Sequence, residues 1–206
     1  MITVENFIKQ CSTSIKDNNF VVIGTDEWKD VLNMQISELY PEIAIVTTTT
    51  IATGDIDYSI AELDLSDESV FVNIGGVKKI FEVDTNGVTT KIESYTYEED
   101  LKIVFLKSTI SSGSYVKVVW YGEMQEKDSY DDEINMGPAS VSILRKACLK
   151  EVISRILMDK SKLDRYRTLT GQANEYVLMA MQKNYTADIE IAKRRTSNTL
   201  KVRTFG

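Results

Sequence analysis

The sequence predicts an α+β protein: a helical bundle built from both ends of the chain, with an inserted antiparallel β domain and an extended C-terminal tail. Apolar residues recur at helical spacing near both ends of the chain. The middle is rich in Val, Ile, Thr, Tyr and Phe, interrupted by turn residues, which is typical of strands. The predicted divisions are N-terminal helices at 1–42, a β domain at 43–124, an acidic linker at 125–136, a helix hairpin at 137–194 and a basic tail at 195–206.

The first segment predicts two short helices. Residues 4–16 carry apolar side chains at helical spacing after Thr3, whose hydroxyl suits a helix N-cap. Thr25 is expected to cap a second helix at 26–40. Pro41 would end that helix, because proline disfavours helical backbone in the residue before it.

The β domain is expected to be a small sandwich or barrel of antiparallel strands joined by short turns. Gly75-Gly76, Asn86-Gly87 and the stretch 111–114 are the predicted turns. The predicted strands are residues 43–53, 69–74, 78–83, 91–97, 102–106 and 115–121.

The C-terminal part predicts two long antiparallel helices. Pro138 suits the first turn of the first, where its missing N–H has no cost. A break is expected at 159–161, and the second helix is expected to bend near Gly171. The two helical parts each have an apolar face, so we expect them to pack together.

Composition excludes several classes of function. The chain has 206 residues, 43% of them hydrophobic, which is enough for a proper core. It has no histidine, which excludes Ser-His-Asp, Cys-His and His-metal chemistry. Cys11 and Cys148 are far apart without metal-type spacing, so we expect buried thiols in a reducing compartment. Residues 1–11 lack the features of a signal peptide, and no stretch is apolar enough to predict a membrane span.

No residue pattern predicts a catalytic site, a metal site or a cofactor site. Asp55-Ile56-Asp57 and the acidic stretch 128–133 could offer carboxylates to a hard cation, but neither has the order of a calcium loop. We interpret both as solvated loops. Gly75-Gly76 is followed by neither Lys-Ser/Thr nor a helix, so it is not a phosphate loop. We therefore expect no cofactor and no enzymatic activity.

The net charge of −7 conceals opposite charges along the chain. Residues 54–133 hold 18 acidic and 7 basic side chains, whereas residues 134–206 hold 6 acidic and 14 basic ones. An acidic β module and a basic helical end can attract each other between copies and set the register of an assembly. The alternative is that both are simply solvated surfaces.

The C-terminal tail is the predicted partner-binding element. No acid follows Glu190, and apolar and basic residues alternate from Leu200 to Arg203, as in a strand added to a partner's sheet. A frayed terminus and a nucleic-acid-binding tail are the alternatives. The candidate docking residues are Arg195, Thr199, Leu200, Lys201, Val202, Arg203 and Phe205.

This order of elements resembles the head–tail connector proteins of tailed bacteriophages, namely the T7-type tail-tubular adaptors and the P22-type head-completion proteins. The resembling parts are the helices at 4–16 and 26–40, the segment 57–60 leading into 69–76, the long helices after Pro138, and the basic C-terminus. The resemblance covers most of the chain and is architectural, without a specific residue motif.

The resemblance implies a virion protein of the neck or tail, made in the host cytoplasm. Such adaptors form a ring, commonly of twelve copies, whose helical bundles surround a channel for the genomic DNA. Their C-terminal tails dock on the portal protein, and their β domains face a downstream tail protein or neighbouring subunits. An acidic channel would let DNA pass without binding it. The alternatives are another tail or baseplate protein, and a carbohydrate- or ion-binding β module on a helical stalk.

Overall fold

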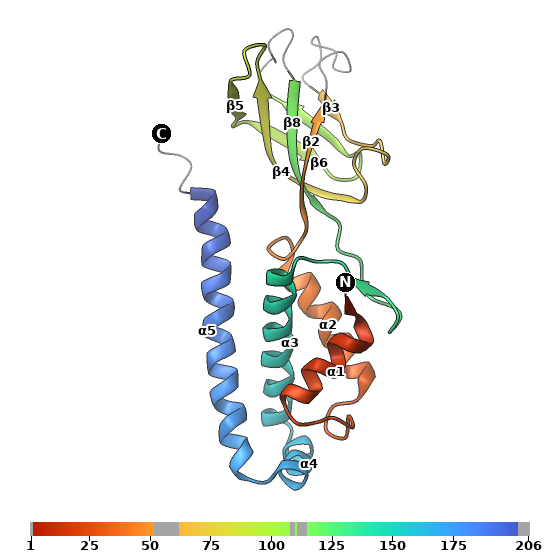
Figure 1. The fold of residues 1–206 in the computed structure, drawn as a ribbon, viewed down its shortest axis with the longest axis vertical. Helices are drawn as coiled ribbons and strands as arrows, with labels where there is room; N and C mark the ends of the chain where they lie inside the picture. The colour runs from red at the N-terminus through yellow and green to blue at the C-terminus, as the bar shows by residue number, and fades with distance from the viewer. Residues whose placement is uncertain (1, 52–61, 108–109, 111–114, 202–206) are drawn as a thin grey trace. The chain divides into compact units, whose positions relative to one another are not determined.

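A computed structural model describes residues 2–51, 62–107, 110 and 115–201, with side chains as far as residue 194. The chain divides into two compact units (Figure 1): a helical unit, Met1–Ile43 with Gln125–Gly206, and a β unit, Ala44–Met124. The α+β class predicted from the sequence is confirmed, because helices and antiparallel sheets are both present.

The helical unit begins with α1 (Val4–Ser14) and α2 (Thr25–Leu39). Thr3 caps α1 as predicted, since its hydroxyl accepts a hydrogen bond of 3.3 Å from the amide of Asn6. Gly24 is the N-cap of α2, so Thr25 is the first helical residue instead of the expected cap. The helix ends at Leu39, just before Pro41, as the sequence predicts.

The C-terminal part contains α3 (Pro138–Met158), α4 (Lys160–Thr170) and α5 (Ala173–Lys201). Pro138 lies in the first turn of α3, as predicted. The prediction of one bent helix after the break is wrong, because α4 and α5 are separate. Gly171, between them, has φ +90°, a backbone conformation that side chains rarely adopt.

Helix α3 is the centre of the helical unit and packs against α1, α2, α4 and α5. Helix α5 runs back alongside α3 (Figure 1). The buried side chains repeat at helical spacing on α1, α2 and α3, which explains why apolar periodicity located these helices. They include Phe7, Ile8, Trp28, Leu32, Ile36, Leu144, Val152, Ile153 and Ile156.

The expected linker at 125–136 is tied to the N-terminus by backbone hydrogen bonds. Strand β9 (Glu133–Ile134) pairs with β1 (Ile2–Thr3) in an antiparallel ladder. The amide of Val4 donates to the carbonyl of Asp132 at 2.9 Å, and Ile134 is buried. This part of the chain is therefore integrated into the helical unit despite its polar sequence.

The described residues of the β unit form two antiparallel sheets. The four-stranded sheet has the order β2 (Val46–Ile51), β8 (Tyr115–Gly122), β4 (Ile74–Val83), β5 (Thr89–Ile92). The three-stranded sheet has the order β3 (Glu62–Asp64), β7 (Ile103–Leu106), β6 (Tyr95–Glu98). Side chains of both sheets form one core that includes Leu63, Ile80, Val104, Val118 and Trp120.

Two strand predictions in this unit are wrong. Residues 69–73 form turns, and Asp67 stabilises them by accepting hydrogen bonds from the amide and hydroxyl of Ser69. Gly75-Gly76 lies inside β4, where the register with β8 shifts between Ile74 and Gly76, so the pair marks a bulge instead of a hairpin turn. The predicted strand at 91–97 is divided between β5 and β6, which belong to different sheets.

The turn predicted at Asn86-Gly87 is confirmed and connects β4 to β5. Gly87 has φ +80°, and the Asp84 carboxylate accepts hydrogen bonds from the amides of Asn86 and Val88. The stretch 111–114 lies outside the described residues.

The prediction of an extended chain from residue 195 is wrong for residues 195–201, which continue α5. Lys and Arg are good helix formers and are favoured near a helix C-terminus by the macrodipole. Glu190 and Arg194 add an ion pair of 3.5 Å one turn apart. Residues 202–206 lie outside the described part of the chain.

Candidate functional site

The residues predicted to dock on a partner are only partly described by the structure. Arg195, Thr199, Leu200 and Lys201 lie on the last turns of α5, and their side chains are outside the described set. Val202, Arg203 and Phe205 also lie outside it. The structure therefore assigns these residues to no site.

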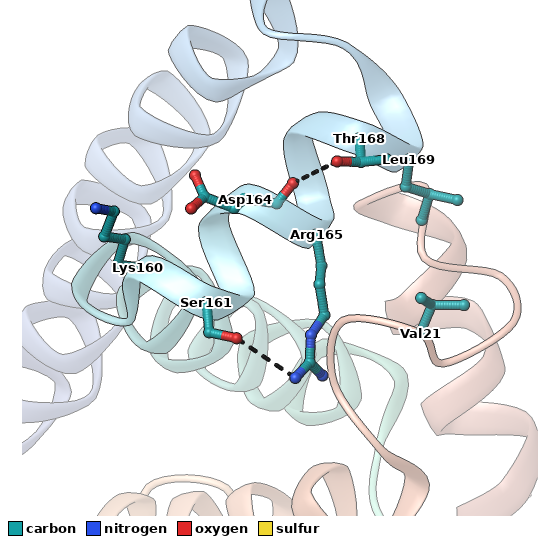
Figure 2. Close-up of a pocket in the computed structure, with 7 residues that line it drawn as sticks. All are labelled: Val21, Lys160, Ser161, Asp164, Arg165, Thr168 and Leu169. Atoms are coloured by element: carbon teal, nitrogen blue, oxygen red, sulfur yellow. Dashed lines mark hydrogen bonds between the residues drawn. The ribbon is translucent and has the colours of Figure 1, made fainter.

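One hollowed surface of the described helical unit is a groove along α4, which we call the α4 groove. It has a volume of about 900 Å³ and is open to solvent. It lies between α4 and the loop that joins α1 to α2 (Figure 2). Its lining consists of Val21, Lys160, Ser161, Asp164, Arg165, Thr168 and Leu169.

One wall of the groove depends on a buried carboxylate. Asp17 is fully buried, and its carboxylate accepts hydrogen bonds of 2.8–3.2 Å from the backbone amides of Val21, Val22 and Ile23. These bonds satisfy a group that would be costly to bury without partners. Val22 and Ile23 point into the core, and Val21, which is 48% exposed, remains at the groove.

The opposite wall is α4, whose inner side is fixed by one aromatic ring and two ion pairs. Asp159 caps the helix by accepting hydrogen bonds from the amides of Ser161 and Lys162. Tyr166 is buried, and burial raises the pKa of its phenol. Lys162 contacts Glu27 of α2 at 2.5 Å, and Arg167 contacts Glu175 of α5 at 2.7 Å.

The outer side of α4 carries two cations that these ion pairs do not use. Among the residues that the structure describes, neither Lys160 nor Arg165 forms an ion pair. Arg165 donates a long hydrogen bond of 3.4 Å to the Ser161 hydroxyl (Figure 2). Asp164, the one acid among the described residues that line the groove, contacts Arg167 at 3.2 Å. The groove is therefore a cationic surface with exposed apolar side chains at Val21 and Leu169.

The groove's side chains fit docking better than acid–base chemistry. The Ser161 hydroxyl lies beside a guanidinium, which stays protonated and cannot accept its proton. Within the described ranges, the structure contains no group of three or more His, Cys, Asp or Glu residues that could hold a metal ion. A cationic groove with apolar walls can receive a surface that is both acidic and apolar.

Both cysteines are buried free thiols, as the sequence predicts. Cys11 lies on α1 and Cys148 on α3, two helices that pack together. Burial raises the pKa of Cys11 to about 12 and raises that of Cys148 well above its usual value. Such thiols behave as small apolar core residues.

Sequence reasoning missed the α4 groove. The basic run from Lys160 to Arg167 is visible in the sequence, but the sequence does not say which of its cations are paired within the fold. Besides that run, the available signal is the charge asymmetry, which gives residues 134–206 an excess of positive charge.

The search against protein-family models gives no match for this chain, and the comparison with curated proteins gives none either. None of the helices in the described ranges combines the length and the apolar character that a membrane span requires.

Proposed function

We propose that the chain is a structural virion protein of a tailed bacteriophage. It forms an oligomeric adaptor ring between the portal and the tail, and the C-terminal end of α5 docks on the portal protein. Its other contacts are with neighbouring copies and a downstream tail protein, and the genomic DNA passes through the ring without specific binding.

The observation that carries this proposal is the construction of the helical unit from both ends of the chain, with the β unit inserted between α2 and α3. This is the order of elements that the resemblance to head–tail connectors implies.

Helix α5 gives further support to a docking role for the C-terminus. It has 29 residues and is about 43 Å long at 1.5 Å per residue. Its inner side packs on α3 through Leu178 and Ile189, whereas Tyr176 and Ile191 are exposed. It ends in a basic segment that contains no acid after Glu190.

Removal of residues 195–206 tests the proposal. We expect the truncated protein to keep its circular dichroism and thermal unfolding, because its described cores end before residue 195. It should lose its association with the portal protein encoded in the same genome, measured by co-purification and native mass spectrometry. A control with Lys117, Lys150 and Lys183 changed to alanine removes the same number of positive charges and should still associate.

Electron microscopy of the complex of full-length chain and portal gives the second readout. A closed ring of this protein, commonly of twelve copies in such connectors, is the expected result. Portal rings without bound copies of this protein would contradict the proposal. A complex with a tail component but not with the portal would favour the alternative role as another tail or baseplate protein.

A further inference from the structure

A surface on the β unit is acidic, whereas the α4 groove is cationic. Strands β6 and β7 form a hairpin whose turn is residues 99–102. The turn is closed by a hydrogen bond of 3.2 Å from the Lys102 amide to the Glu99 carbonyl, and Lys102 has φ +53°. Strand β3 pairs with β7 beside this turn, so that Asp64 lies opposite Ile103.

We call this surface the acidic tip and define it as residues 64–68 and 98–102. Its acidic side chains, all exposed, are Asp64, Asp67, Glu68, Glu98, Glu99 and Asp100. Lys102 is its one basic residue, and it contacts Glu68 at 3.6 Å. Leu101, in the middle of the turn, is 60% exposed.

Two carboxylates of the tip, those of Asp64 and Asp67, are held in their charged form by local hydrogen bonds. Hydrogen bonds from Ser66 lower the pKa of Asp64, and hydrogen bonds from Ser69 lower the pKa of Asp67. The tip therefore presents an apolar side chain surrounded by negative charge.

The α4 groove is complementary to the tip in both respects. It presents Lys160 and Arg165, which form no ion pair among the described residues, and it exposes the apolar side chains of Val21 and Leu169. Opposite charges around a small apolar contact fix partner choice and orientation at an interface.

We infer that the acidic tip of one copy docks in the α4 groove of a second copy. Leu101 packs against Val21 and Leu169, while Glu99 and Asp100 lie beside Lys160 and Arg165. Because tip and groove are different surfaces, every copy offers one of each, and the contact is heterologous. Repeated contacts of this kind close into a ring or extend as a filament.

This inference specifies the contact between copies in the proposed ring, and its biological setting rests on that proposed function. The contact itself is a property of the purified chain. The two proposals can therefore be contradicted separately. Copies that associate through this contact but do not bind the portal would support the contact and contradict the adaptor role.

Reversed charges test the contact by sedimentation velocity over a range of protein concentrations. The groove variant carries Lys160→Glu with Arg165→Glu, and the tip variant carries Glu99→Lys with Asp100→Lys. Each alone should weaken self-association at least tenfold, and an equimolar mixture should restore it, because the lysines of one variant then face the glutamates of the other. A control with Glu93→Lys and Glu123→Lys makes the same change of charge away from the tip and should associate as the unchanged protein does.

Cysteine cross-linking tests the contact if the association is too weak to be detected by sedimentation velocity. Leu101→Cys in one copy is mixed with Leu169→Cys in another under mild oxidation, and the native buried thiols remain unreactive. We expect a disulfide-linked dimer at several times the yield obtained with Tyr176→Cys, a position that is 76% exposed and outside the groove. Equal yields at Leu169→Cys and Tyr176→Cys, or no cross-link at Leu169→Cys, would overturn the inference.

Discussion

Asp17 shows how one side chain organises a surface several residues away. Its carboxylate accepts hydrogen bonds from the amides of Val21, Val22 and Ile23 in the loop between α1 and α2. Two of these residues then enter the core while Val21 is held outside it. The apolar edge of the α4 groove therefore depends on a buried polar contact.

The buried thiols predict a pH dependence of folding stability. The folded pKa of Cys11 is about 12, whereas an unfolded thiol has a pKa of about 8.5, so the unfolded chain loses this proton first as pH rises. Stability should therefore be unaffected below the unfolded pKa and should fall above it, by at most about 1.4 kcal/mol per pH unit for each thiol. Urea unfolding between pH 7 and about 10.5 measures this.

Cysteine variants isolate that contribution from other groups. Cys148 shifts in the same direction as Cys11, and burial also raises the pKa of Tyr166. Cys11→Ala and Cys148→Ala keep the tyrosine contribution and should each lose less stability between neutral and alkaline pH than the unchanged protein. Identical alkaline losses in all three proteins would contradict the assignment to the thiols.

At the scale of elements, Gly171 decides where α4 ends. Its φ of +90° and ψ of 151° are in a region that residues with a Cβ rarely occupy. We expect Gly171→Ala to lower the free energy of unfolding by about 1–3 kcal/mol because of backbone strain. Denaturant unfolding measures the loss.

Gly24 provides a matched control for that prediction. It is the N-cap of α2, has φ −68°, and makes no side-chain cap hydrogen bond. Gly24→Ser should leave stability unchanged or raise it by a few tenths of a kcal/mol, because serine can cap the helix. A loss at Gly24→Ser as large as that at Gly171→Ala would show that strain at Gly171 is not the cause.

Elements marked by local signals were predictable from sequence. Thr3 and Pro138 mark the starts of α1 and α3, and Asn86-Gly87 marks the β4–β5 turn, because capping and positive φ are local properties. Gly75-Gly76 misled the prediction, since the same glycine pair suits a turn or a bulge and only pairing with β8 decides between them.

The C-terminal helix and the α4 groove required tertiary information. The loss of apolar periodicity predicts the end of a helix near residue 195, yet α5 continues to Lys201. Lys162 is paired with Glu27 of α2, which lies 135 residues away in the sequence. Arg167 is paired with Glu175 of α5, which lies eight residues further along the chain, and only the turn at Gly171 brings the two together. Charge patterns in the sequence therefore indicated a basic surface without locating it.

At the scale of the whole molecule, the two units have separate cores. The helical core centres on α3, and the β core lies between the two sheets around Trp120. Separate cores allow each unit to unfold as its own cooperative step.

We therefore predict two calorimetric transitions that respond independently to mutation. Ile153→Ala in α3 and Ile80→Ala in β4 each remove a fully buried side chain and should each cost about 2–5 kcal/mol. Each variant should lower the melting temperature of one transition and leave the other unchanged. A single transition shifted by both variants would show that the units unfold together.

The chain enters the β unit on β2 and leaves it on β8, which are neighbouring paired strands. Where they meet, the amide of Gly122 donates to the carbonyl of Ile45 at 2.9 Å. Because Ile45 and Gly122 are adjacent, a two-residue turn could join them directly. The segment between them can therefore be replaced by another in evolution without a change in the helical unit. The surface that the β unit presents can therefore differ between related proteins while the helical unit around α3 stays the same.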